Sequence, residues 1–552
     1  MTDPEVQRAD IDADQEVDAA ARLVARSRKV LANGELAMSA RPLLFGETGV
    51  YPQFICAAEG CRIRDTTGGE YVDWVVGWGT ALLGYGRPEI DAAVRQQLSA
   101  APTLSMPHAL EVEVAERIVE LVPNAEMVGF GKNGSDAVTA AVRLARAVTE
   151  RDVVLQFGFH GFHDWFAAGD RGIRGLPSAF GGLVHPFRYN DLAGLEALFA
   201  RYRGRVAAVV MEPFQCELPR DGFLADVKSL AHRHGALLVF DEMITGFRVA
   251  RGGAQELTGV LPDLACFGKA LSNGMPLSAY VGPRELMRSA DSVGVDMGCR
   301  GETLSLAAAR AALDIHAEEP VAERVAEIGR RVRAGLEEEA HREGVPLRLI
   351  GHPARLELEF ADHGHLTRGA ALGLFVQGCL ERGVLTNGLV FPTLAHDEAA
   401  IDATLRAARE ALRIVRRGAE GRSHTLPPPF GPAGLGFLDA AEVTDGQLRL
   451  SGWLLPLASP PDEVELLDAR GRAYTAELGV REDVARAHPE IAGAERCAWV
   501  VAVPGAPEPG ESWTLRARRA GRVVFRCRLV GGLRAYPRSM PRELRDGHVV
   551  EF

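Results

Sequence analysis

Short apolar runs alternate with helical patterns between about residues 126 and 282, and this alternation constrains the fold more than any other feature. The runs AAVVM and ALLVF are apolar at every position, which is typical of strands covered on both faces in a mostly parallel sheet. Segment 135–148, between the strand-like runs EMVGFG (126–131) and VVLQF (153–157), carries apolar residues at helical spacing. Strands that alternate with helices predict an α/β fold, with a mostly parallel sheet flanked by helices.

The length of 552 residues requires more than one hydrophobic core, and the hydrophobic pattern and residue composition change several times along the chain. An alternating segment with a TTGG turn (54–75) predicts a small antiparallel element, and two long Arg/Glu/Ala helices (321–343 and 398–417) surround the strand-like run RLELEF (355–360). A stretch rich in Pro and Gly predicts a linker, and short strands follow it. We therefore predict an N-terminal extension with part of a small domain (1–80), a large α/β domain (81–317), the C-terminal part of the small domain (318–417), a linker (418–436) and a β-sandwich module (437–552).

The charge pattern argues against polyanionic partners. The formal net charge is −12, and no Lys/Arg run forms the basic patch that nucleic acid or an anionic membrane surface requires. No apolar run reaches the roughly 18 to 20 residues that span a bilayer, and the acidic N-terminus does not look like a signal peptide. We expect a cytoplasmic protein that binds neither nucleic acid nor membrane. Eight scattered cysteines without a C-x-x-C pair are expected to be reduced, with no metal site.

Lysine is rare in this chain, and its rarity narrows the search for a reactive amine. Of 62 basic residues only four are lysines, namely Lys29, Lys132, Lys228 and Lys269. Lys29 and Lys228 lie in polar or amphipathic helical patterns and are expected to face solvent. Lys269 follows a buried strand, where burial lowers the pKa of an amine and favours reaction with an aldehyde.

Charged residues follow three of the predicted strands. Glu212 comes after AAVVM, Asp241 and Glu242 follow ALLVF, and Lys269 comes two residues after DLACF. Ligands of doubly wound sheets bind beyond the carboxyl ends of the strands. A single acid at a strand end is typically a cap or turn residue, but charged groups at three ends of one sheet indicate a binding site.

The segment KNGSDA (132–137) lies where a strand gives way to a helix. Gly134 permits a sharp turn, and Ser135 with the free amides of the first helical turn suits a phosphate group. An ordinary helix cap is the alternative interpretation, and Lys132 is a candidate counter-charge for the phosphate. A phosphate cup, a strand-end carboxylate and an isolated lysine together are what pyridoxal 5′-phosphate requires.

Five motifs in sequence resemble the class III, fold-type I pyridoxal-phosphate aminotransferases, above all the branch that includes glutamate-1-semialdehyde aminomutase. The resemblance covers roughly residues 35 to 415. The motifs are VFDEMITGFR (239–248), FGKALSNGMP (267–276), KNGSDA (132–137), GFHGFHDW (158–165) and GETLSLAAA (301–309).

The resemblance implies a role for each matching residue at the cofactor. Lys269 would carry the internal aldimine and move a proton between substrate and cofactor, and Asp241 would pair with the pyridinium nitrogen. Phe159 and Met243 would pack on the two faces of the ring, and Glu212 would lie nearby. The phosphate would contact Asn133, Gly134, Ser135 and, from the neighbouring subunit, Thr303.

The contribution of Thr303 from a neighbouring subunit implies a homodimer with shared active sites. Trp78 lies where the family lines the substrate pocket, and Arg41 is the nearest candidate for binding a substrate carboxylate. His160 and His163, beside aromatic residues and without a third ligand, are expected to shape the pocket and to bind no metal.

The implied activity is transamination by a ping-pong cycle, in which an amino-acid donor gives its amino group to a small keto or aldehyde acceptor. The alternative is an intramolecular aminomutase, which needs no separate donor. A non-catalytic scaffold is disfavoured by Lys269 beside Asp241. The C-terminal module resembles β-sandwich modules appended to enzymes of surface-polysaccharide assembly, which favours a sugar or a biosynthetic intermediate as acceptor; a docking domain without a ligand is the alternative.

Overall fold

The structure is a computed structural model. It describes residues 23, 26–27, 30–31, 54–167, 175–364, 366, 368–420, 434–444, 447–456, 463–467, 472–480, 498–504, 512–519, 522–530 and 550–551. The chain forms two compact units, one from residues 55–359 with 382–410, the other from residues 1–54, 360–381 and 411–552.

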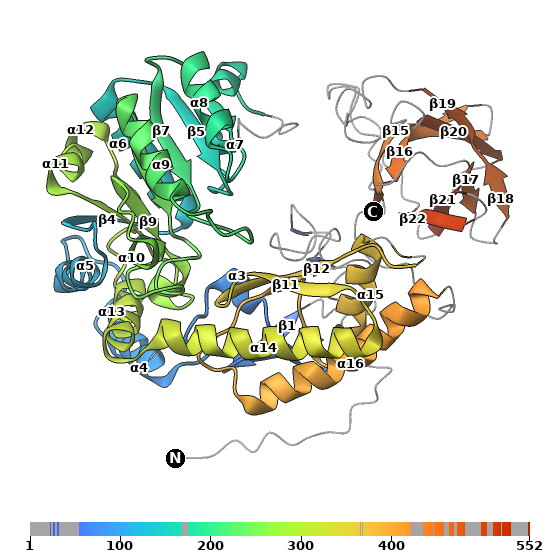
Figure 1. The fold of residues 1–552 in the computed structure, drawn as a ribbon, viewed down its shortest axis with the longest axis horizontal. Coiled ribbons are helices and arrows are strands. Elements are labelled where there is room, and N and C mark those ends of the chain that lie inside the picture. The colour runs from blue at the N-terminus through green and yellow to red at the C-terminus, as the bar shows by residue number, and fades with distance from the viewer. Residues whose placement is uncertain are drawn as a thin grey trace. The chain divides into compact units, whose positions relative to one another are not determined.

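A seven-stranded sheet forms the centre of the first unit (Figure 1). Its order is β4 (Met127–Gly131), β10 (Ser278–Gly282), β9 (Leu264–Phe267), β8 (Leu237–Asp241), β7 (Val206–Met211), β5 (Val153–Phe157) and β6 (Val184–Pro186). Strand β10 is antiparallel to β4 and β9, and the pairs from β9 to β6 are parallel. The predicted mostly parallel sheet is thereby confirmed.

Helices accompany the strands of this unit in the predicted alternation. They are α3 (Val76–Gly79), α4 (Pro88–Leu98), α5 (Ala109–Leu121), α6 (Gly134–Thr149), α7 (Asp164–Ala167), α8 (Leu192–Arg201), α9 (Phe223–Arg233), α10 (Ala254–Thr258), α11 (Arg284–Met287), α12 (Ala290–Val293), α13 (Thr303–Glu318) and α14 (Val321–Glu343), with 3₁₀ turns η2 (Ser178–Gly182) and η3 (Lys269–Ser272).

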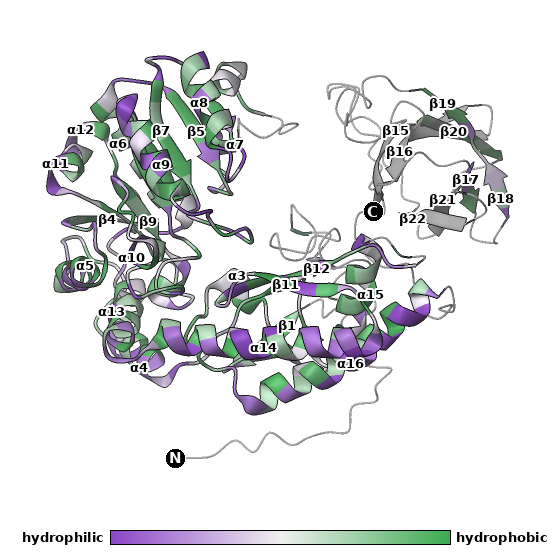
Figure 2. Cartoon of the chain, viewed as in Figure 1, coloured by the Kyte–Doolittle hydropathy of each residue, from purple (hydrophilic) through white to green (hydrophobic). Residues whose placement is uncertain are grey.

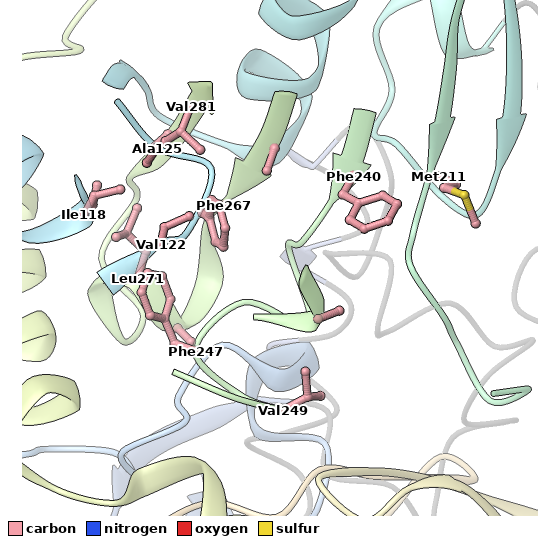
Figure 3. Packing of buried hydrophobic residues seen from close by; sticks show 14 of the residues in the cluster. Ile118, Val122, Ala125, Met211, Phe240, Phe247, Val249, Phe267, Leu271 and Val281 are labelled. Atoms are coloured by element: carbon pink, nitrogen blue, oxygen red, sulfur yellow. The ribbon is translucent and has the colours of Figure 1, made fainter. Parts of the chain in front are cut away.

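Both faces of the sheet are covered, which explains why its central strands are apolar throughout (Figure 2). On β7, Ala208 and Val210 pack in a cluster with α6, whereas Val209 and Met211 belong to the cluster that includes α5, α9 and α13. Figure 3 shows part of the second cluster, with Phe240 and Phe267 from β8 and β9. Each fully buried side chain of this kind contributes about 1.5–3 kcal/mol, so these layers hold the strand ends in fixed positions.

Two smaller sheets complete the first unit. In one, β1 (Ile55–Glu59), β2 (Arg62–Asp65) and β3 (Glu70–Asp73) are antiparallel, and β13 (Val384–Leu385) joins β3 in parallel. The other has the order β11 (Leu347–His352), β12 (Arg355–Phe360) and β14 (Leu389–Val390). The TTGG turn lies between β2 and β3 as predicted, and Gly68 adopts a positive φ of 85° there.

The C-terminal region is entirely β-structure in its described residues. One sheet has the order β15 (Gly434–Thr444), β16 (Gln447–Pro456), β20 (Ala498–Pro504) and β19 (Glu477–Gly479), and the other β18 (Ala473–Thr475), β17 (Glu463–Leu467), β21 (Ser512–Arg519), β22 (Arg522–Val530) and β23 (Val550–Glu551). The sheets contact each other between β17 and β20, where Val464, Leu466, Val501 and Val503 are buried. This agrees with the predicted β-sandwich.

The helix α16 (Glu398–Ala419) extends two residues beyond the predicted end at 417, and α15 (Arg368–Leu380) precedes it. Most of the predicted linker, residues 421–433, lies outside the described residues. No helix in the described part of the chain is long and apolar enough to cross a membrane.

Candidate active site

The carboxyl ends of β7, β8 and β9 bring three of the predicted residues to one edge of the sheet. Glu212 follows β7 directly, Asp241 is the last residue of β8, and Lys269 comes two residues after β9. The strands are parallel neighbours, so their ends lie side by side. The charges of Glu212 and Asp241 both act on the Lys269 amine, which places the three groups in one site.

The amine of Lys269 is the reactive group that this edge offers. The residue is partly buried, and no hydrogen bond or ion pair joins its Nζ to any residue that the structure describes. Burial lowers the pKa of the amine to about 8, although the charges of Glu212 and Asp241 oppose the shift. Its backbone φ of 47° lies in the left-handed region, a strained conformation that is typical of functional sites.

The carboxylate of Asp241 is held in a fixed direction. Its Oδ2 lies 2.7 Å from Nδ1 of His160, and its Oδ1 accepts a hydrogen bond of 3.1 Å from the amide of Met243. Both Asp241 and His160 are buried, and Trp165 stacks beside the imidazole with a centroid distance of 6.3 Å. The sequence analysis predicts that His160 shapes the pocket, but it does not predict the contact between His160 and Asp241. The GFHGFHDW motif was the only feature of the sequence that pointed to His160.

Two backbone amides at the start of α6 are available to an anion. Asn133 caps the helix, and its side chain accepts from the amide of Asp136 while the Asp136 carboxylate accepts from the amides of Lys132 and Asn133. The amides of Gly134 and Ser135 have no acceptor among the described residues. The segment is therefore both an ordinary capping box and an open anion cup.

The loops around this cup are packed too closely for larger residues. A Cβ on Gly161 would lie 2.0 Å from Oγ of Ser135, and Gly161 has a φ of 98°. A Cβ on Gly134 or Gly268 would lie 3.0 or 2.7 Å from the sulfur of Met243. Met243 thus lies between the anion cup and the residue that precedes Lys269.

Phe159 and Glu212 are connected through the backbone. The Phe159 amide donates to Oε1 of Glu212 at 2.9 Å, and Gln215 donates to the same oxygen at 2.6 Å. The Phe159 ring is 53% exposed and meets Phe166 edge-on at 5.6 Å. An exposed aromatic face at the sheet edge suits a planar ligand.

Thr303 and Lys132 are engaged within the chain itself. The Thr303 hydroxyl donates to the carbonyl of Ala101 at 2.9 Å. Nζ of Lys132 pairs with Glu302 at 3.0 Å, and Glu302 caps α13, the helix that begins at Thr303. Lys132 therefore joins the N-termini of α6 and α13, so its charge is already paired with a carboxylate.

The predicted substrate residues are less well placed. Trp78 is partly buried with a φ of 61°, and no hydrogen bond or ring contact joins its side chain to the sheet-edge residues that the structure describes. Its neighbour Gly79 is held by its carbonyl, which accepts 2.8 Å from the buried guanidinium of Arg248. Arg41 lies outside the described residues.

Comparisons with known proteins agree with this geometry. The sequence profile of the class-III aminotransferases matches residues 46–412, and the chain belongs to this family. A glutamate-1-semialdehyde 2,1-aminomutase from Syntrophobacter fumaroxidans is 36% identical over 398 residues, which are 67% of this chain and 92% of that protein. These matches confirm the family that the sequence predicts, and with it the predicted cofactor, pyridoxal 5′-phosphate.

Two solved structures share the fold. The FumI protein of Sphingopyxis sp. MTA144, whose structure is described as a PLP internal aldimine form, has a TM-score of 0.68 and 31% identity over 74% of this chain and 98% of that one. An omega-transaminase from Sphaerobacter thermophilus has a TM-score of 0.65 and 26% identity over 72% of this chain and 98% of its own. These likenesses confirm the predicted fold-type I architecture.

The lowered pKa of Lys269 gives a testable pH dependence in the protein freed of cofactor. A pKa of about 8 means that the unprotonated, nucleophilic amine becomes the main form above pH 8. An ordinary lysine, with a pKa near ~10.4, is still protonated there. Competitive labelling with trace acetic anhydride, read by mass spectrometry, should give a midpoint near pH 8 for Lys269.

The same shift affects the stability of the cofactor-free protein. Because the folded-state pKa is below the unfolded value, the unfolded chain binds more protons between about pH 8 and ~10.4, and this residue's contribution to stability rises with pH across that window.

A lysine-containing peptide serves as the control for the labelling with acetic anhydride. A labelling midpoint for Lys269 equal to that of the peptide would contradict the burial of its amine.

Proposed function

We propose that this chain is a pyridoxal-phosphate-dependent transaminase that moves an amino group from an amino-acid donor to a small keto or aldehyde acceptor in a ping-pong cycle. The observation that carries the proposal is the unpartnered amine of Lys269 beside the buried Asp241–His160 pair at the carboxyl edge of the sheet. An acceptor such as a sugar or a biosynthetic intermediate is consistent with the resemblance of the C-terminal module.

The residues at this edge fit the cofactor. The free amides of Gly134 and Ser135, with Asn133 at the cap, would hold the phosphate, and Phe159 and Met243 would pack against the ring. Glycine at positions 134, 161 and 268 lets the loops approach closely here, because a Cβ at any of them would lie within 3.0 Å of a Ser135 or Met243 side-chain atom. Pyridoxal phosphate supplies an aldehyde that reacts with amines and a ring that takes up electrons when its nitrogen is protonated.

The chain's own groups have two tasks in this chemistry. The buried carboxylate of Asp241 would keep a proton on the ring nitrogen, and His160 fixes its orientation through the 2.7 Å contact. Nζ of Lys269 would hold the cofactor and then, as an unprotonated amine, take the proton from the substrate α-carbon. A general base is most effective when its pKa lies near the working pH, and the pKa of about 8 brings the Lys269 amine near neutral pH. Glu212 would fix the loop that bears Phe159.

We further infer a homodimer in which Thr303 contributes to the phosphate site of the partner, as the family resemblance implies. We retain the predicted segment boundaries, the substrate role of Trp78 and Arg41, and a cytoplasmic location as parts of this proposal. The experiment for the dimer is light scattering of the purified protein combined with complementation between two inactive variants.

An aminomutase is the second candidate, because relatives 33–36% identical to this chain carry that name. The two functions differ in their need for a donor. A transaminase incubated with its acceptor should form product only when a donor such as glutamate is added, and each half-reaction should stop after one turnover. An aminomutase should convert glutamate-1-semialdehyde continuously without a donor. Product analysis by liquid chromatography, with and without glutamate, separates them.

A further inference from the structure

Arg355, the first residue of β12, is a buried cation without an anion. It is 6% exposed. Its Nη1 has one partner, the sulfur of Cys216 at 3.6 Å, and its Nε is buried with no partner among the described residues. No carboxylate in the described part of the chain lies within ion-pair distance of it. A guanidinium does not lose its proton in proteins, so a buried one without a counter-charge is costly unless a ligand supplies it.

The nearby cysteine does not provide that charge. The Cys216 thiol donates to the carboxylate of Glu357, which lies two residues after Arg355 on the same strand. Burial, assisted by Glu357, raises the pKa of the thiol to about 12, so the sulfur stays neutral. The neutral thiol of Cys216 therefore forms a hydrogen bond with the Glu357 carboxylate and supplies no negative charge to the Arg355 guanidinium.

Three features connect Arg355 to the site around Lys269. Its positive charge contributes to the lowered pKa of the Lys269 amine, after burial and beside the charge of Arg248, so the two groups are near enough to interact electrostatically. The loop 212–217 that follows β7 carries both Cys216 and Glu212, and Gln215 ties the loop to Glu212 at 2.6 Å. On the other side, Arg248 from the Asp241 loop donates to the carbonyl of Ala354 at 3.2 Å, which fixes the start of β12.

Arg248 is a second buried guanidinium near this site, and its Nε likewise has no partner among the described residues, but the backbone accepts from its terminal nitrogens. Its two terminal nitrogens donate to the carbonyls of Gly79, Ala354 and Pro392, and its Cζ lies 5.4 Å from the centroid of the Phe391 ring. These contacts give both terminal nitrogens of Arg248 backbone acceptors. Arg355 is 6% exposed, against 0% for Arg248, and has no carbonyl acceptor among the described residues.

We propose that Arg355 is the subsite for a carboxylate group of the substrate, so that this chain acts on amino compounds that carry a carboxylate. A planar guanidinium binds a carboxylate through two parallel hydrogen bonds, which selects such substrates over plain amines. This inference rests on the proposed function. It names the substrate class of the same site.

The test compares amines that differ only in the carboxylate, using the full-length holoenzyme. The pairs are L-alanine with isopropylamine, 4-aminobutyrate with n-butylamine, and 5-aminopentanoate with n-pentylamine. The rate of the first half-reaction is followed by the change in cofactor absorbance. Arg355→Gln should lower kcat/KM for the preferred carboxylate by roughly 10- to 100-fold, the range that hydrogen bonds to a charged group provide, and should change kcat/KM for its plain amine by less than about 3-fold.

Two variants and one binding measurement complete the experiment. Arg355→Lys keeps the positive charge but not the paired N–H donors of the guanidinium, and it should recover part of the lost kcat/KM for the carboxylate substrate. Arg348→Gln, on the adjacent strand β11, removes a 76% exposed arginine and its ion pair with Glu359, and should leave both rates unchanged. Calorimetry with glutarate should show an affinity at least roughly 10-fold weaker in Arg355→Gln than in wild type.

The outcomes separate the subsite from the proposed function. Equal losses for both members of a pair, no loss for either, or a wild type without preference for the carboxylate would overturn the subsite. If wild type reacts with no amine but Arg355→Gln still weakens glutarate binding, the subsite stands and transamination fails. If wild type reacts normally while glutarate binding and the rate ratios are unaffected by the substitution, transamination stands and the subsite fails.

Discussion

Replacing Lys269 with alanine should reduce amino-group transfer by at least roughly 10³-fold, because under the proposed mechanism the substitution removes both the amine that would attach the cofactor and the base that would move the substrate proton. Borohydride reduction of the wild-type holoenzyme, followed by digestion and mass spectrometry, should place the pyridoxyl group on the peptide that contains Lys269. The variant should carry no such modification on any of its three remaining lysines.

A matched control lies on α9. Lys228 is partly exposed there, and Lys228→Ala should retain both the rate and the pyridoxyl modification of Lys269. The assignment of Lys269 would be refuted by an alanine variant that still fixes the cofactor covalently and turns over at the wild-type rate.

Replacing Asp241 with asparagine should lower turnover by roughly 10²- to 10³-fold while the protein stays folded. The amide keeps the shape of the carboxylate but removes the buried charge that would protonate the ring nitrogen, and breaking such a buried pair costs about 3–5 kcal/mol. Both hydrogen-bond partners, His160 and the Met243 amide, remain in place. Single-turnover kinetics of the reconstituted variant measure the loss, and thermal unfolding reports whether the fold is intact.

Asp226→Asn, at an exposed position of α9, is the control for the loss of one negative charge and should behave as wild type. An Asp241→Asn variant with the same single-turnover rate as wild type would show that this carboxylate does not act on the cofactor. A variant that fails to bind cofactor at all would show up as absent absorbance, and Asp241→Glu then distinguishes a lost charge from a displaced one.

The sheet and its reactive edge could be predicted from sequence because local patterns determine them. Runs that are apolar at every position are compatible with few structures other than a strand covered on both faces, so the strand ends and the residues after them follow directly. Lys269 could be chosen because only four lysines exist. The segment KNGSDA predicts a helix start from its glycine and its cap-forming residues, and the structure begins α6 at Gly134 with Asn133 as the cap.

Contacts between distant segments could not be predicted in this way. In RLELEF the alternation places Arg355 and Glu357 on one face of the strand, but the pattern does not reveal which charge is covered. The loop 212–217 decides that, and its position depends on tertiary packing. The contact between His160 and Asp241 joins two motifs whose proximity appears only when β8 and the loop after β5 are folded together.

The three carbonyl contacts of Arg248 have a consequence for how this site changes in evolution. They hold the chain near Trp78, at the start of β12 and before α16 by main-chain oxygens alone, so the identity of the neighbouring side chains does not affect the anchoring. Residues such as Trp78 and Arg355 are therefore free to be exchanged without moving the backbone that presents them. Under the proposed roles of Trp78 and Arg355 in substrate binding, selectivity could diverge among descendants of this enzyme while its reactive centre is inherited intact.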